Sequence, residues 1–240
     1  CRAGASPFVS VAMFRFYARV AMLSSLWFVK VEIFSDIACP FCYIGTRYFA
    51  EALGQSGRAD QIEVEWRSFQ LDPGAPRRAE GDLYDHLSRK FGISREEART
   101  MNERIAAMGS TAGIEFDYES ATATNTFDAH RMLKLSAEHG AEAALADAFF
   151  GAYFTGSDDL SSPEDLTRLA NEAGIDPQRA AETASGDEFG DEVRADQELA
   201  ALLGITAVPA FVFDRSTALS GAQPVEVIRA AIEQAVEGTD

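Results

Sequence analysis

Alternating apolar and charged positions mark the first structured segment of the chain. Residues 28–34 read FVKVEIF, a period of two that is typical of a β-strand, and IEVEWRSFQ predicts a second strand over residues 62–70. Between them, Pro40 suits the first turn of a helix because its missing N–H needs no partner there, and good helix formers run from Tyr43 to Leu53, before Gly54. The pattern therefore predicts a strand, a helix and a strand in succession.

The periodicity becomes helical in the middle of the chain. A loop, DPGAPRR, follows Leu71, and helical spacing extends over residues 82–186. SREE at residues 94–97 is a capping-box pattern, and a capping residue precedes a proline at Ser162-Pro163 and again at Asp176-Pro177. We expect four to six helices in this block.

Strand character returns late in the sequence. AFVF at residues 210–213 and ALS at 218–220 predict two strands, and a closing helix is expected from Pro224 to Val236. Pro209 directly precedes the first of these strands. Because proline cannot donate a ladder hydrogen bond, it must stand at the beginning of the strand or in a special turn.

Composition narrows the class of protein. The chain has 240 residues, 47% hydrophobic and 25% charged, which is ordinary for a folded globular protein. Its net charge of -17 disfavours a nucleic-acid partner, because phosphate contacts need clustered Lys and Arg. No membrane association is expected.

Residues 1–28 are interpreted as an N-terminal extension of uncertain order. Arg2, Arg15 and Arg19 are its only charges, and they precede the apolar run VAMLSSLWFV. That run is too short to span a bilayer, and no small-residue cleavage site follows it. Met22 is a candidate natural start.

Two of the three cysteines are spaced as a C-x-x-C pair. Cys39 and Cys42 follow the first predicted strand, whereas Cys1 has no neighbours that suggest chemistry. A structural zinc site takes four ligands, so no metal is predicted, and redox chemistry is the favoured interpretation. Helix N-termini favour a thiolate, so Cys39 is the predicted nucleophile and Cys42 the resolving thiol.

Two further side chains are weaker candidates. Asp36 precedes Cys39 by three positions and is a candidate proton acceptor, with an N-cap role or simple exposure as alternatives. His130 shares a helical stripe with Phe127 and Lys134, and a structural histidine is the alternative there.

Three motifs in combination resemble one family. FSDIACPFCYIG, TNTFDAHRMLKLSAEHG and GITAVPAFVF followed by LSGAQPVEVI are similar to DsbA-like thioredoxin-fold proteins, in particular the FrnE-type subgroup related to 2-hydroxychromene-2-carboxylate isomerases. The resemblance covers Val29 to Val236. It implies an α/β protein with a thioredoxin fold and a large all-helical insertion domain. The expected parts are residues 29–72 and 187–240 for the thioredoxin fold and 73–186 for the insertion.

The resemblance also implies roles for site residues. Pro209 would be a cis-proline that faces the cysteine pair and exposes the Val208 backbone for pairing with an extended peptide. The helix of His130 would line the active-site groove. The expected catalytic residues are Cys39, Cys42 and Pro209, and the expected substrate-binding residues are Pro40, Phe41, Val208 and His130. No cysteine follows Cys42, so a second redox relay is not expected.

The favoured function is thiol–disulfide oxidoreduction on protein or small-molecule substrates, without a cofactor but with glutathione open as a redox partner. One alternative is a glutathione-dependent isomerase or transferase, although that branch tends to carry serine where Cys39 stands. Another is a non-enzymatic, holdase-like peptide-binding module. A cytoplasmic location is expected, because the sequence shows no clean signal sequence and no set of structural disulfides; a C-x-x-C pair in that compartment is usually catalytic or redox-sensing. The direction of the reaction and the oligomeric state are not readable from the sequence.

Overall fold

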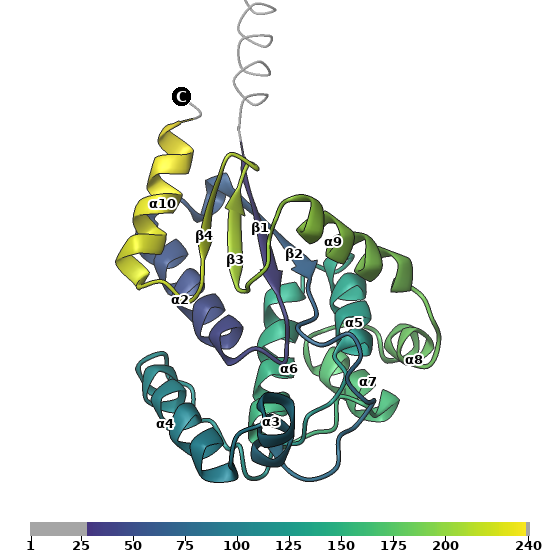
Figure 1. Ribbon diagram of the computed structural model, residues 1–240. Helices are drawn as coiled ribbons and strands as arrows, with labels where there is room; N and C mark the ends of the chain where they lie inside the picture. The colour runs from purple at the N-terminus through teal and green to yellow at the C-terminus, as the bar shows by residue number, and fades with distance from the viewer. Residues whose placement is uncertain (1–27, 239–240) are drawn as a thin grey trace, which may run out of the picture.

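The computed structural model describes residues 28–238 and contains a four-stranded mixed sheet (Figure 1). The predicted extension, with Cys1 and Met22, therefore lies outside the described residues, apart from Phe28. The strand order is β2-β1-β3-β4, in which β1 is parallel to β2 and antiparallel to β3. The strands are β1 (Val29–Ser35), β2 (Ile62–Ser68), β3 (Ala210–Phe213) and β4 (Thr217–Ser220).

Helices cover both faces of this sheet. On one face, α2 (Pro40–Ser56) packs beside α10 (Val225–Glu237), and together with the strands they enclose an apolar core (Figure 1). On the other face lie α5 (Phe127–Ala137) and α9 (Gly190–Leu202), which both contact β2. Because both faces are covered, β1 is buried along almost its whole length.

Six helices lie between β2 and α9, as the helical spacing predicted. Besides α5 they are α3 (Leu83–Phe91), α4 (Arg95–Thr111), α6 (Glu142–Thr155), α7 (Pro163–Glu172) and α8 (Pro177–Ser185). All three predicted caps form: a capping box closes at Ser94, and the side chains of Ser162 and Asp176 accept backbone N–H groups. The fold is the α/β thioredoxin fold with an all-helical insertion that the resemblance implied.

The structure corrects several predicted boundaries. Strand β1 begins and ends one residue later than predicted, and β2 ends at Ser68 rather than residue 70. Helix α2 continues through Gly54 to Ser56, and Gly57, in the left-handed conformation, ends it. Helix α9 was not predicted. A short 3₁₀ turn, η1 (Ala59–Gln61), leads into β2.

An aromatic cluster joins the inserted helices to α2. The ring of Tyr43 stacks on Phe150 of α6, with ring centroids 5.0 Å apart, and on Phe154, at 6.3 Å. Phe116 meets Tyr43 edge-on at 6.1 Å. Phe150 and Phe154 are almost fully buried, so this cluster fixes the position of α2 relative to the inserted helices.

A buried carboxylate on β1 is held by two arginines. Glu32 is 1% exposed and accepts hydrogen bonds from Arg67 of β2, at 2.8 Å, and from Arg215 in the β3–β4 turn, at 2.8 and 2.9 Å. The hydrogen bonds from Arg215, followed by those from Arg67, outweigh burial and lower the pKa of Glu32 to about 2. Glu32 therefore stays ionised in the folded protein well below its ordinary pKa.

We expect Glu32→Gln to lower the free energy of unfolding by about 2–3 kcal/mol at about pH 7, because the variant leaves two guanidinium groups without their shared carboxylate. A carboxyl with a lowered folded-state pKa stabilises the fold above its unfolded pKa of about 4.5 and loses that contribution as the pH falls towards 2. The difference between wild type and variant should therefore shrink over that window in urea titrations. The control is Glu119→Gln at an exposed pair with Arg99, which should cost less than about 1 kcal/mol at any pH.

Candidate active site

The cysteine pair stands where β1 leads into α2. After Ser35 the chain turns through residues 36–38, and the N–H of Cys39 donates to the carbonyl of Asp36 at 3.0 Å. Cys39 is the N-cap of α2, Pro40 is its first helical residue, and Cys42 follows in the first turn. Both cysteines are free thiols and both are buried. The predicted placement of the pair at a helix N-terminus is therefore confirmed.

A distant part of the chain completes the surroundings of Cys39. The thiol of Cys39 donates to the backbone carbonyl of Val208, with Sγ and the oxygen 3.6 Å apart, and the Val208–Pro209 peptide bond is cis, as the resemblance implied. Pro209 packs directly on Gly45 of α2, where an added Cβ would come within 2.7 Å of the proline ring. Glycine at this position allows the loop before β3 to approach the thiol.

Cys42 is the interior thiol of the pair. Its side chain is fully buried, and burial, followed by the neighbouring Cys39, raises its pKa well above the ordinary value. The Ser35 hydroxyl and the backbone N–H of Asp36 act in the opposite direction but are outweighed. Cys42 therefore holds its proton until a partner sulfur and a proton acceptor are both in place.

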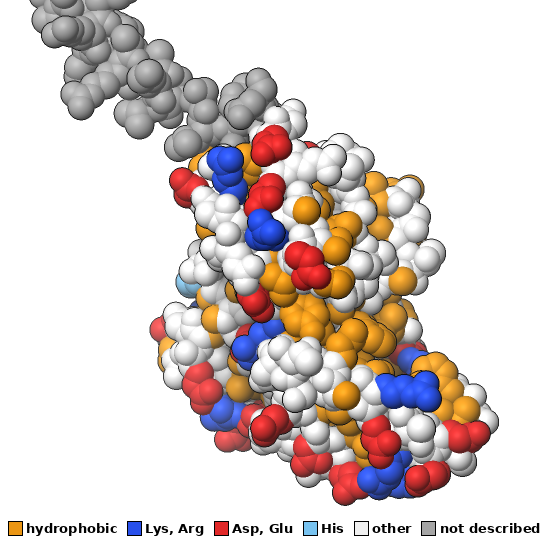
Figure 2. Space-filling model, turned by 90° about the vertical axis from the view of Figure 1, so that its left-hand side faces the viewer, with side chains coloured by type: hydrophobic (Ala, Val, Ile, Leu, Met, Phe, Trp, Pro, Cys, Tyr) orange, Lys and Arg blue, Asp and Glu red, His pale blue; other side chains and the backbone are white. Residues whose placement is uncertain are grey.

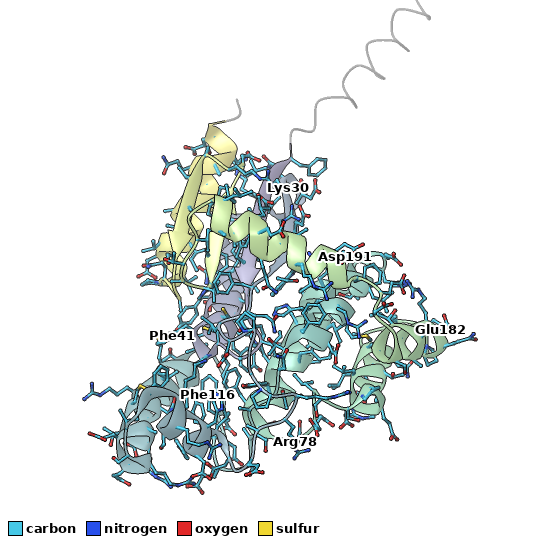
Figure 3. All side chains as sticks on the ribbon, turned by 45° about the vertical axis from the view of Figure 1, so that its right-hand side comes forward. Lys30, Phe41, Arg78, Phe116, Glu182 and Asp191 are labelled. Atoms are coloured by element: carbon cyan, nitrogen blue, oxygen red, sulfur yellow. The ribbon has the colours of Figure 1, made fainter. Side chains whose placement is uncertain are left out.

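A mainly apolar cavity of about 260 Å³ opens beside Cys39. Its walls come from the start of α2, from the loop after β2 and from α3 and α4, and Pro40 and Phe41 both line it. Figure 3 shows Phe41 where the start of α2 faces the α3–α4 pair. The hydroxyl of Thr124, also in the lining, is buried without a hydrogen-bond partner. This cavity can hold an apolar group next to the thiol, and the Thr124 hydroxyl is free to make a polar contact with that group.

Exposed apolar side chains surround this cavity. Phe41, Leu71, Phe91 and Met101 all line it, and between 39% and 57% of each residue's surface is exposed. Figure 2 shows hydrophobic side chains gathered in a band where the upper, sheet-bearing part of the molecule meets the lower, helical part. Large exposed apolar residues grouped around one cavity are typical of a binding surface.

Asp36 has neither of the structural roles considered as alternatives for it. It is 1% exposed, so it is not a surface residue, and the N-cap of α2 is Cys39. Its carboxylate accepts from the N–H groups of Ala38, at 3.2 Å, and Leu71, at 2.7 Å, and from the hydroxyl of Thr126, at 2.8 Å. Burial would raise the pKa of Asp36, but His130 and these donors together lower it.

His130 lies against Asp36 and does not line the apolar cavity. It is 1% exposed, its Nε2 lies 3.5 Å from Asp36 Oδ1, and it is not among the residues that line the 260 Å³ cavity. The structure therefore brings Cys39, Pro40, Phe41, Val208 and Pro209 together, whereas His130 reaches this group only through Asp36. Its predicted part in substrate binding stays a prediction.

Sequence reasoning missed the lining residues that α4, α6 and the loop before α5 contribute. Asn102, Thr124, Thr126 and Tyr153 line the cavity, yet none belongs to the C-x-x-C segment. Thr124 and Thr126 both lie within the quoted TNTFDAH motif, so that motif was the available signal; Asn102 and Tyr153 gave none. Within residues 28–238, no group of three or more metal-ligating side chains could hold an ion, and no helix is long and apolar enough to cross a bilayer.

The paired thiols at a helix N-terminus, beside a mixed thioredoxin-type sheet, define a thiol–disulfide oxidoreductase in the general sense. A family model described as DSBA-like thioredoxin domain matches residues 30–233, and the chain belongs to that family. The crystal structure of the probable DsbA oxidoreductase SCO1869 from Streptomyces coelicolor is 39% identical, with 87% of this chain and 90% of that chain covered and a TM-score of 0.81. The resemblance found in the sequence is confirmed.

Two more distant structures share the fold. A 2-hydroxychromene-2-carboxylate isomerase is 11% identical, with 88% of this chain and 97% of that chain covered and a TM-score of 0.65. The cytosolic disulfide reductase DsbM from Pseudomonas aeruginosa, solved with GSH, is 20% identical, with 87% of this chain and 99% of that chain covered and a TM-score of 0.59. At these identities the likeness concerns the fold.

Proposed function

We propose that the protein catalyses thiol–disulfide exchange between the Cys39–Cys42 pair and substrates that place an apolar group in the cavity beside Cys39. The observation that carries this proposal is the position of Cys39, a free thiol at the N-cap of α2 that also lines the 260 Å³ cavity. The helix N-terminus stabilises negative charge as the thiolate forms, and the cavity holds the substrate beside it.

The reaction proceeds in two balanced exchanges. The Cys39 thiolate attacks one sulfur of a substrate disulfide, a Cys39–substrate bond forms, and the other substrate sulfur leaves as a thiolate. Cys42 then loses its proton and attacks Cys39 Sγ, which releases the second substrate sulfur and leaves the protein oxidised. The same steps in reverse oxidise a substrate dithiol. Neither direction requires a metal ion or a nucleotide.

The Val208 carbonyl gives the site a place for a substrate backbone. In the free protein this carbonyl accepts a hydrogen bond from the Cys39 thiol, with the sulfur and the oxygen 3.6 Å apart. Once that thiol has reacted, the carbonyl can accept a hydrogen bond from a substrate backbone N–H. An extended peptide would then pair with the loop before β3 while its apolar side chain enters the cavity. Protein disulfides with an apolar neighbouring residue, and compact apolar disulfides, are the substrate classes that fit.

Glutathione is part of this proposal as the redox partner that returns the pair to its working state. The name of the Pseudomonas aeruginosa structure supports it, since that disulfide reductase was solved with GSH and is called cytosolic. We infer a cytosolic setting on the same ground. Glutathione would form the mixed disulfide at Cys39, the thiol that lines the cavity.

We expect the Cys39–Cys42 pair to equilibrate with glutathione buffers in a single two-electron transition, because both sulfurs lie in the first turn of one helix. The measurement counts free thiols by alkylation and intact mass, with Cys1 replaced by serine. The midpoint potential of this transition shows whether the protein reduces or oxidises its substrates. A value near that of thioredoxin, about -270 mV, indicates a reductant, and a value near that of DsbA, about -120 mV, indicates an oxidant.

Two outcomes of this titration would contradict the proposal. The thiols could titrate independently, or the protein could accumulate stable glutathione adducts without forming the internal disulfide. Tight glutathione binding with no redox transition would favour the glutathione-dependent isomerase instead. The matched control is Cys42→Ser, which should form only a one-to-one adduct at Cys39.

A further inference from the structure

Cys42 needs a proton acceptor that the cavity beside Cys39 does not provide. Under the proposed function, on which this inference rests, Cys42 must lose its proton before it can attack the mixed disulfide. Cys42 is fully buried, and its pKa is raised well above the ordinary value. Direct transfer to bulk water is therefore unfavourable, and an internal route should accelerate the step.

A second, much smaller cavity lies between the ends of β1 and β2 and helix α5. Its volume is about 10 Å³, about the space that one water molecule requires, and Ser35 and His130 both line it. Each presents a buried polar atom without a hydrogen-bond partner, Oγ of Ser35 and Nε2 of His130. Two orphaned polar atoms facing one water-sized space indicate a built water site. The Ser35 hydroxyl forms no hydrogen bond in this structure, but it lies near enough to the Cys42 thiol to act against burial and lower that thiol's pKa.

Asp36 orients the imidazole but is poorly suited to take the proton itself. Oδ1 already accepts from Ala38 and Thr126, and Oδ2 accepts from Leu71, so both oxygens are occupied. His130 and these donors lower the pKa of the Asp36 carboxyl, although burial alone would raise it. Nε2 of His130 lies 3.5 Å from Oδ1, which places the carboxylate where it stabilises an imidazolium.

The other charged groups that line the small cavity are already paired. Arg67 of β2 binds Glu32 and Asp196, and Lys134 of α5 binds Asp196. Among the described residues that line this cavity, His130 is therefore the one side chain with a ring nitrogen that can accept a proton and release it again.

We propose that His130 is the proton-exchange partner of Cys42, with the Ser35 hydroxyl and one water in the small cavity carrying the proton between them. In the resolving step the proton moves from Cys42 Sγ to the imidazole, Cys42 Sγ bonds to Cys39 Sγ, and the substrate sulfur leaves with the electron pair of the broken bond. In the reverse step the imidazolium returns the proton to Cys42 as its thiolate is displaced.

The test follows the two thiolates released from a symmetrical nitroaryl disulfide in stopped flow. With Cys1 replaced by serine in every variant, the first release reports attack by Cys39, and the second reports resolution by Cys42. In His130→Gln we expect an unchanged first phase and a second phase slowed by about a hundredfold, within the usual contribution of general acid–base catalysis. The second-phase rate of His130→Gln should rise about tenfold per pH unit, because solvent must then remove the Cys42 proton, whereas the wild-type rate should depend less steeply on pH.

Two further variants keep the test decisive. His139→Gln makes the same substitution at an exposed position just beyond α5 and should leave both phases unchanged. Ser35→Ala removes the hydroxyl with little change in volume and should slow the second phase even if His130→Gln folds poorly. An unchanged second phase and pH profile in Ser35→Ala, or in folded His130→Gln, would overturn the relay. No second release in wild type would instead refute the proposed dithiol function.

Discussion

Replacement of Cys39 by serine is expected to reduce turnover of a disulfide substrate by about a thousandfold or more, the scale on which enzymes lose activity with their nucleophile. A serine hydroxyl is not ionised at neutral pH and cannot form the mixed disulfide. The fold should be unaffected, since the hydroxyl can donate to the Val208 carbonyl that accepts the thiol. The measurement is the rate at which the reduced protein, with Cys1 replaced by serine, releases nitroaryl thiolate from a nitroaryl disulfide in the absence of glutathione.

Cys42→Ser is the matched control for this experiment. It retains the nucleophile, so the first exchange should proceed at the wild-type rate, but the mixed disulfide at Cys39 should persist and be visible by intact mass. Full exchange activity in Cys39→Ser would refute the proposed mechanism. Suppression of client aggregation that survives loss of both cysteines would instead support a peptide-binding module.

Replacement of Phe150 by alanine should lower the free energy of unfolding by about 3–5 kcal/mol, the usual cost of removing a fully buried phenylalanine. Phe150 is 0% exposed, and its ring stacks on Tyr43 with an interplanar angle of 7°. The variant would leave a cavity between α6 and α2 that the surrounding rings fill only in part. Urea unfolding should show a lower midpoint with an unchanged slope.

Phe91→Ala is the comparison for Phe150→Ala. It makes the same change on α3, where the residue is 57% exposed, and it should alter the free energy of unfolding by less than about 0.5 kcal/mol. A loss below about 1 kcal/mol in Phe150→Ala would show that the aromatic cluster does not hold the inserted helices on α2.

The elements that sequence reasoning found are those whose patterns are local. β1 alternates along a single strand, and α7 and α8 begin with a capping residue before a proline, so short-range rules were sufficient. Helix α9 was missed for a tertiary reason. It buries Val193, Asp196 and Ala200 on one face, and the carboxylate of Asp196 interrupts the apolar period. That carboxylate is buried because it pairs with Arg67 and Lys134 on other elements.

The candidate site divides in the same way. The cysteine pair and its helix were readable because they occupy one short segment. The environment of Asp36 was not, since its partners Leu71 and Thr126 follow it by 35 and 90 positions. The cavity beside Cys39 likewise depends on how α3 and α4 pack, and no local pattern encodes a space between helices.

The contact between Cys39 and Val208 has a consequence for synthesis of the chain. The two residues are 169 positions apart, so at about 5–20 residues per second the ribosome completes the second on the order of ten seconds after the first. Strand β3, which pairs with β1 and follows Pro209 directly, is made equally late. During that interval the nascent polypeptide carries both thiols without the carbonyl that later covers the reactive one. The growing chain is therefore open to oxidation or adduct formation at Cys39 before the mature enzyme exists.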